Sequence, residues 1–430
     1  MSPRARLFSL SLVLLPLLPL AVVVSVVDGC GSSSATAADA PADAMSEATA
    51  VAADAQVPEA AVPDDAKPAG CPRMAAAADR ARKVVVSHPF GADGGKTTAY
   101  EVVDLAADGT LSHPSTPVTF AMGTALSAPI VFTPDGEVGL VAQDDGSVGV
   151  FRLPAGGAAP VVVHAAFKGA FSAGGVVLAP DGARAWILDP NTEKNGGGVF
   201  EVAIHCDGTL AELGRVVPGG GATAMALLPG SATMALVAAQ KAFDSPATND
   251  LHLVDLGAGK RVSSTTPFGD LDPIVSSIAV MADGKYALVA DDGPIVGSRV
   301  AVVGLVPMLA PVAILQTPFP AAVVASPFGN AAIVMNDDST DQIHVLSYDP
   351  SKPAAPFVIT GELAYKFGKP QIPVTASVID RGALKGSVFI GENTAVRKVV
   401  FMPNGTVVDG AKLSFAGGLE TVIGVVGVQP

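Results

Sequence analysis

The sequence predicts an all-β protein, a seven-bladed β-propeller whose blades are four-stranded antiparallel sheets. Two observations carry this prediction. Short apolar runs typical of β-strands recur seven times, at steps of 45 to 56 residues, and most of them follow a Gly-containing turn. The 430 residues also include 46 Gly and 35 Pro, with 49% hydrophobic residues. That composition favours a well-buried, turn-rich protein over a helical one.

The strands of each unit follow one order. An apolar stretch such as "SSIAVMADG", residues 276–284, ends in a turn where Gly supplies the positive φ of a tight hairpin. A second strand, an acidic or Gly-rich turn and an alternating strand such as "LHLVDL" follow, and some units add an Asp-Gly-Thr or Asn-Gly-Thr turn. Such turns between apolar runs indicate hairpins, and four strands joined in this way form one propeller blade. The positions we take as equivalent are Val85, Val141, Ile187, Val237, Val289, Val334 and Phe389. Because the units differ in length, a ring of six or eight blades is the alternative.

The two ends of the repeat region predict how the ring closes. The first unit begins at Val84 with a second-strand pattern, whereas residues 419–430, "LETVIGVVGVQP", have the pattern of a first strand. We therefore expect the C-terminal strand to complete the first blade, which leaves no open sheet edge.

Residues 1–29 have the pattern of a lipoprotein-type signal peptide. Arg4 and Arg6 precede an uncharged stretch over residues 7–27, and "VDGC" then places Gly before Cys30. This motif resembles the lipobox of bacterial lipoproteins, although Asp28 departs from it, and the resemblance implies lipid attachment at Cys30. An uncleaved membrane anchor and plain secretion are the alternatives. We expect an extracytoplasmic protein anchored to the bacterial cell membrane or outer membrane.

Residues 30–70 are rich in Ala, Pro and acidic residues and contain no aromatic residue. Such a segment buries too little apolar surface to offset its ordering entropy, so it predicts a disordered tether ahead of a propeller over residues 71–430. In an exported protein Cys71 and Cys206 would lie where disulfides persist. A bond between these two residues is one possibility, and two unrelated thiols are the other.

The net charge of the chain limits the classes of molecule that it can bind. Lys and Arg number 26 against 40 Asp and Glu, a net charge of −14. Nucleic acid is excluded as a partner because binding it requires a basic surface. We expect a monomer that contacts the membrane through its lipid anchor and binds an envelope protein or a small ligand.

Three turn motifs carry a resemblance to a known family. Each is followed by a strand and an Asp-rich turn, and the three are Pro134-Asp135-Gly136, Pro180-Asp181-Gly182 and Ala282-Asp283-Gly284. From Val84 to Pro430 the chain resembles the YVTN or lactonase-like family of seven-bladed β-propellers. The resemblance implies that the turns after the second strands share a face with the connections between blades, and that this face holds the ligand. The acidic residues expected there are Asp144, Asp145, Asp189, Asp291, Asp292, Asp337 and Asp338.

These carboxylates have two explanations. If they converge, they could hold Ca²⁺ or Mg²⁺ through oxygen ligands. The simpler explanation is that Asp forms turns by bonding nearby backbone amides. No G-x-S-x-G motif occurs, and the inner strands lack the Arg-His pair of the related bacterial 6-phosphogluconolactonases. Binding without a cofactor or catalytic residue is therefore the first hypothesis. A metal-assisted, lactonase-like hydrolase is the alternative.

Overall fold

The computed structural model describes residues 70–154, 158–193, 196–239, 251–269, 274–292, 299–336, 342–373 and 375–430. The predicted signal peptide and tether, Cys30, Asp337 and Asp338 lie outside these residues.

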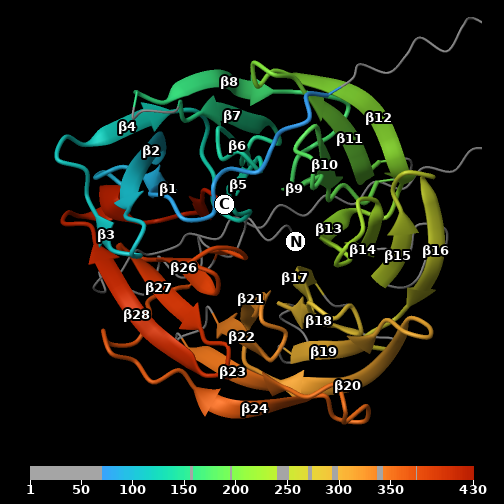
Figure 1. Ribbon diagram of the computed structural model, residues 1–430. Helices are drawn as coiled ribbons and strands as arrows, with labels where there is room; N and C mark the ends of the chain where they lie inside the picture. The colour runs from blue at the N-terminus through green and yellow to red at the C-terminus, as the bar shows by residue number, and fades with distance from the viewer. Residues whose placement is uncertain are drawn as a thin grey trace, which may run out of the picture. The chain divides into compact units, whose positions relative to one another are not determined.

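The described chain is a ring of seven antiparallel blades, as predicted (Figure 1). Blade 1 consists, from the centre outwards, of β29 (Val426–Val428), β1 (Arg82–Phe90) and β2 (Lys96–Leu105), with β3 (Leu111–Ser112) and β4 (Val118–Ala121) both paired to β2. Blade 2 consists of β5 (Val131–Phe132), β6 (Val138–Ala142), β7 (Val148–Arg152) and β8 (Val161–Phe167). Blade 3 consists of β9 (Gly175–Leu178), β10 (Arg184–Asp189), β11 (Gly198–Ile204) and β12 (Leu210–Pro218).

The other four blades repeat this order. Blade 4 consists of β13 (Ala222–Leu227), β14 (Met234–Ala239), β15 (Leu251–Asp255) and β16 (Lys260–Thr265). Blade 5 consists of β17 (Val275–Val280), β18 (Tyr286–Asp291), β19 (Arg299–Gly304) and β20 (Ala310–Gln316). Blade 6 consists of β21 (Pro320–Ala325), β22 (Ala331–Asn336), β23 (Ile343–Tyr348) and β24 (Phe357–Glu362). Blade 7 consists of β25 (Thr375–Val378), β26 (Ser387–Glu392), β27 (Ala395–Phe401) and β28 (Val407–Ser414), and a 3-10 turn (Leu419–Thr421) precedes β29.

The C-terminal strand closes the ring, as predicted. In the register of β1 with β29, Val84 pairs with Val428, and Val86 pairs with Val426. Blade 1 thus combines residues more than 300 positions apart in the chain, and the edge of β1 is covered.

Packing between blades explains why the second strands are almost wholly apolar. Both faces of a blade are buried, so successive side chains enter different seams. Leu140 packs toward blade 3 with Ile187, whereas Val141 packs toward blade 1 with Tyr100. Gly139 lies opposite Phe151, and a Cβ on it would lie 2.3 Å from that ring, so glycine here makes room for the aromatic side chain.

Within the described part of the chain, no helix has the length and apolar character needed to span a membrane.

Candidate functional site

The segment just before β1 crosses one side of the ring. We call this segment, residues 70–81, the strap, and the side that carries the turns between first and second strands the lower face (Figure 1). The strap bonds to turns of blades 3, 2 and 7. These bonds run from Cys71 N to Ile204 O (2.7 Å), from Arg73 N to Asp181 O (2.8 Å), from Ala76 N to Pro134 O (3.0 Å), and from Ala383 N to Asp79 Oδ1 (2.6 Å).

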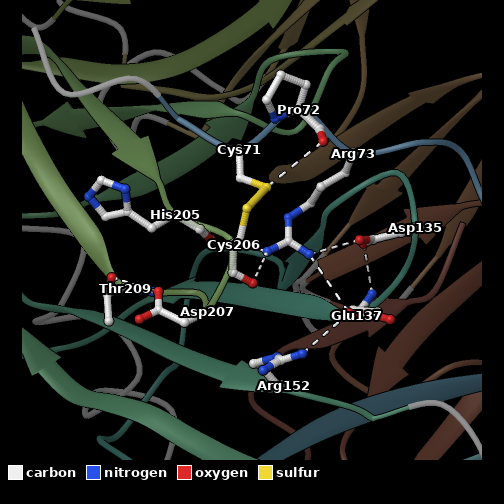
Figure 2. Close-up of a disulfide and its surroundings, with 10 residues drawn as sticks. All are labelled: Cys71, Pro72, Arg73, Asp135, Glu137, Arg152, His205, Cys206, Asp207 and Thr209. Atoms are coloured by element: carbon white, nitrogen blue, oxygen red, sulfur yellow. Dashed lines mark hydrogen bonds and ion pairs between the residues drawn. A yellow bond between two sulfur atoms is a disulfide. The ribbon is translucent and has the colours of Figure 1, made fainter.

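A disulfide fixes the start of the strap. Cys71 bonds to Cys206, in the turn between β11 and β12, with the two Cα atoms 5.0 Å apart (Figure 2). Beside it, Arg73 donates from Nη2 to the carbonyl oxygens of His205 (3.1 Å) and Cys206 (3.0 Å). Its Nη1 forms an ion pair with Asp135 Oδ2 at 2.8 Å, and its side chain is 5% exposed. Arg73 therefore joins the lower-face turns of blades 3 and 2.

Asp135, part of the Pro-Asp-Gly motif, is held from several sides. Its Oδ1 accepts hydrogen bonds from Thr133 Oγ1 (2.6 Å) and Glu137 N (2.9 Å). Burial alone would raise the pKa of Asp135, but the bonds from Thr133, Glu137 N and Arg73 outweigh burial and lower it. The carboxylate is therefore ionised, and both of its oxygens accept hydrogen bonds.

A cavity of about 540 Å³ lies next to the strap, between blades 1 and 2. Its apolar wall includes Val102, Leu105, Val118, Leu153, Pro154 and Pro160. Its charged lining comprises Arg80, Arg82, Lys83, Asp104, Asp135 and Glu137. This combination of an apolar wall and a few polar groups is typical of small-ligand sites.

The acidic groups of the cavity already have basic partners. Lys83 pairs with Asp104, Arg73 pairs with Asp135, and Arg152 lies 3.4 Å from Glu137. Among the described residues, neither Arg80 nor Arg82 forms an ion pair with an Asp or Glu side chain.

The two remaining cavity arginines bond to backbone oxygens. Arg82 donates to the carbonyl oxygens of Arg80 (3.0 Å) and Ala78. Arg80 Nη2 donates to Asp135 O at 3.3 Å and, at 3.5 Å, to Pro430 O. Burial lowers the pKa of the Arg80 guanidinium group, and repulsion from Arg381 lowers it further, against the opposing effect of Asp135. Burial also lowers the pKa of Arg82, with repulsion from Arg80 and Arg381, against the opposing effect of Asp79. The cavity lining thus contains three basic and three acidic residues, of which Arg80 and Arg82 have no Asp or Glu partner.

The acidic residues predicted for the opposite, upper face each bond to a separate neighbouring group. Asp144 Oδ2 pairs with Lys96 at 2.7 Å, and Asp145 Oδ2 pairs with Lys168 at 3.3 Å. Asp189 Oδ1 accepts from Asn191 N at 3.0 Å. The bond of Asp189 is the local contact of a turn-forming residue, whereas the pair of Asp144 with Lys96 joins blade 2 to blade 1.

Blade 5 shows the same behaviour. Asp291, 2% exposed, accepts from Arg299 Nε at 3.2 Å and from Ile274 N at 3.0 Å. The backbone N of Asp292 donates to Ile274 O at 2.9 Å. Among the described residues, no group of three or more His, Cys, Asp or Glu side chains could hold a metal ion. Asp337 and Asp338 lie outside those residues, so a metal site that includes them stays a prediction.

Two polar clusters, one buried and one partly exposed, were not predicted from the sequence. In blade 7, Arg397 is 0% exposed and pairs with Glu392 and with Asp409, the latter at 2.7 Å. Its Nη2 also donates to Gly368 O at 2.8 Å, which holds the connection between blades 6 and 7. The only sequence signal was the basic pair Arg397 and Lys398 within the apolar residues of β27.

The second cluster lies where blades 1 and 7 meet. Glu101 carboxylate oxygens lie 3.4 Å from His88 Nε2 and 3.3 Å from His113 Nδ1, and both imidazole rings pack edge-on against Phe415. The contact to His88 is the main cause that lowers the pKa of Glu101, against the opposing effect of burial. These residues come from separate elements, so their spacing in the sequence gave no sign of the cluster.

Comparison with known proteins agrees with this architecture. No protein-family model matches the chain, and no curated protein matches its sequence. Among solved structures, a periplasmic gluconolactonase of Pseudomonas aeruginosa is 14% identical, with a TM-score of 0.57 over 81% of this chain and 99% of that one. A candidate 6-phosphogluconolactonase of Bacteroides fragilis is 11% identical, with a TM-score of 0.56 over 83% and 99%. The chain has the fold of the lactonase-like β-propellers.

A third match has a different description. A hypothetical selenium-binding protein of Sulfolobus tokodaii is 12% identical, with a TM-score of 0.60 over 81% of this chain and 93% of that one. Proteins with such different descriptions share this ring, so the fold alone does not specify a reaction.

Proposed function

We propose that the protein is a lipid-anchored, extracytoplasmic β-propeller of the YVTN type that binds a small ligand between blades 1 and 2. The observation that carries the proposal is the cavity of about 540 Å³, with its apolar wall and its arginines. A pocket of that size is within the range of small-ligand sites, in which a few placed polar groups orient the ligand. The alternative within this binding function is that the propeller binds another protein of the cell envelope.

Three observations support the cellular location. The N-terminal sequence is similar to a lipoprotein signal that ends at Cys30. The disulfide between Cys71 and Cys206 suits an oxidising compartment. One solved structure of the same fold is described as a periplasmic enzyme.

Metabolic labelling with palmitate tests the anchor. We expect the full chain to carry label and to sediment with membranes, whereas Cys30→Ser loses the label. An unlabelled parent chain, or a Cys30→Ser variant that keeps its label, would contradict lipid attachment at this residue.

Native mass spectrometry tests the binding role. Protein extracted from its own membrane should carry a small non-covalent mass. Ala106, an exposed residue at the cavity wall, offers a place to fill the cavity with Trp. The Ala106→Trp variant should lose the mass while its melting temperature stays within about 2 °C of the parent, because an exposed substitution has little effect on stability. A mass retained equally by both proteins, or absent from both, would contradict binding in this cavity.

A lactonase-like hydrolase is the second candidate, because the P. aeruginosa protein of the same fold is a gluconolactonase. Such an enzyme would use a metal ion on the upper face to activate water. Proton release from a sugar lactone, lost with a chelator and restored by Ca²⁺ or Mg²⁺, would favour the hydrolase. A rate equal to the spontaneous rate under all these conditions would favour binding.

A further inference from the structure

The structure points to an oxyanion subsite in this cavity: we infer that Arg80 and Arg82 bind the carboxylate or phosphate of a small ligand with an apolar body. This inference rests on the proposed small-ligand function and specifies the ligand's chemical class. Arg82 is 2% exposed, and the Nε atoms of both arginines are buried with no hydrogen-bond partner among the described residues. Both arginines line the cavity.

Among the described residues, the two arginines have no Asp or Glu partner in an ion pair, so an anion could pair with them. The cavity carboxylates Asp104, Asp135 and Glu137 are paired with other basic residues. Arg381, from a lower-face turn of blade 7, also lies near and donates to Pro134 O at 3.0 Å. Because buried like charges repel each other at low dielectric, a bound oxyanion would relieve an unfavourable interaction between these guanidinium groups.

The two guanidinium groups are held in place before any ligand binds. Arg82 is fixed by the carbonyl oxygens of Ala78 and Arg80, both in the strap. Arg80 lies against the turn at Gly136, where φ is +74° and a Cβ would lie 2.5 Å from Arg80 Nη2. Glycine therefore permits both the turn and the close approach of the guanidinium group. Holding donors in their bound geometry reduces the entropy lost on binding.

The chemistry of the cavity narrows the class of ligand. A guanidinium group matches the planar fork of a carboxylate or the oxygens of a phosphate, and it binds either more strongly than a neutral acceptor. The apolar wall favours a hydrocarbon or aromatic body attached to that group. The net charge of −14 disfavours long polyanions, so a small monoanion or dianion fits best.

Isothermal titration calorimetry on the mature, disulfide-bonded protein tests the inference. Benzoate and phenyl phosphate probe the two oxyanions, and benzyl alcohol is the neutral analogue. We expect at least one anion to bind, with an affinity that falls as salt increases and exceeds that of benzyl alcohol by about tenfold or more, in line with a charge-assisted bond. The ratio of the two anion affinities identifies which oxyanion the site prefers.

Matched variants locate the binding. Arg80→Gln should weaken anion binding by about tenfold or more, because it removes a charged donor from the cavity. Arg184→Gln removes the same charge from a side chain that is 50% exposed in blade 3, and it should change the affinity less than about twofold. Equal melting temperatures of Arg80→Gln and the parent would show that folding is not the cause.

Three results would overturn the inference, and they differ in whether the proposed small-ligand function also fails. If benzyl alcohol binds as tightly as the anions, and Ala106→Trp abolishes that binding, the oxyanion assignment is wrong while the small-ligand function stands. If Arg80→Gln and Arg184→Gln bind the anions equally well, the anion lies elsewhere. If no probe binds and the purified protein carries no small molecule, both the inference and the proposed function fail.

Discussion

Removing the disulfide offers a sharp test of the strap. The double substitution Cys71→Ala and Cys206→Ala releases a link between residues 135 positions apart. In the chain-entropy treatment, closing a loop of that length destabilises the unfolded state by about 5 kcal/mol. For a domain of roughly 360 residues, this change corresponds to a fall of roughly 6 °C in melting temperature. Differential scanning calorimetry of the purified domain measures the fall.

The remaining cysteine and a reductant serve as controls. A Cys30→Ser variant should melt at the parent temperature, because Cys30 is not part of this bond. A thiol reductant should lower the melting temperature of the parent to that of the double variant, and should leave the double variant unchanged. The reasoning is refuted if the double variant melts within about 1 °C of the parent, since the entropy term alone predicts several degrees.

Three further predictions concern the ring and its buried charges. Truncation after Gly424 removes the buried residues Val425, Val426 and Val428 and uncovers the edge of β1. The free energy of unfolding should therefore fall by at least about 4 kcal/mol. An unchanged urea midpoint would contradict closure of the ring by β29. Arg397→Met leaves the buried Asp409 without a basic partner and leaves Glu392 with Lys412 alone, so it should cost about 3 to 5 kcal/mol. Lys369→Met, at an exposed pair with Glu362, should cost under about 1 kcal/mol, and equal urea midpoints for the two variants would show that the buried network contributes no more than a surface pair. The pKa of Glu101 is lowered below its ordinary value of 4.5, so its ionised form stabilises the fold above that pH, and the stabilisation is lost as the pH falls below it. Glu101→Gln should therefore reduce the loss of stability on acidification, and melting curves at several pH values that coincide with those of the parent would disprove this role.

The architecture was predictable because its determinants are local. A turn sequence such as Asp135-Gly136 specifies a hairpin, and an apolar run such as residues 138–142 specifies a strand. The repeat of about fifty residues specifies the ring. The pattern at residues 419–430 also predicted closure, because a first strand without a second strand after it must pair elsewhere.

The candidate site was less accessible because its contacts are long-range. Arg73 and Asp135 are 62 residues apart, and Arg80 meets Asp135 across 55 residues. The strap itself follows directly on a segment whose composition predicts disorder, so its arginines carried no pattern of their own. The recurrence of Asp in the acidic turns predicted a ligand-binding face, but Asp144 and Asp145 each pair with a separate lysine.

Anomalous diffraction from crystals soaked in sodium selenate would test the central claim, that the cavity between blades 1 and 2 is the binding site, most directly. Selenate is a tetrahedral oxyanion whose selenium atom can be located independently of the protein phases. We predict an anomalous peak in the cavity, with selenate oxygens about 2.7 to 2.9 Å from the guanidinium nitrogens of Arg80 and Arg82. The same crystals with Arg80→Gln should lack the peak. Selenium found only at other sites, or a cavity peak unchanged in the variant, would contradict the claim.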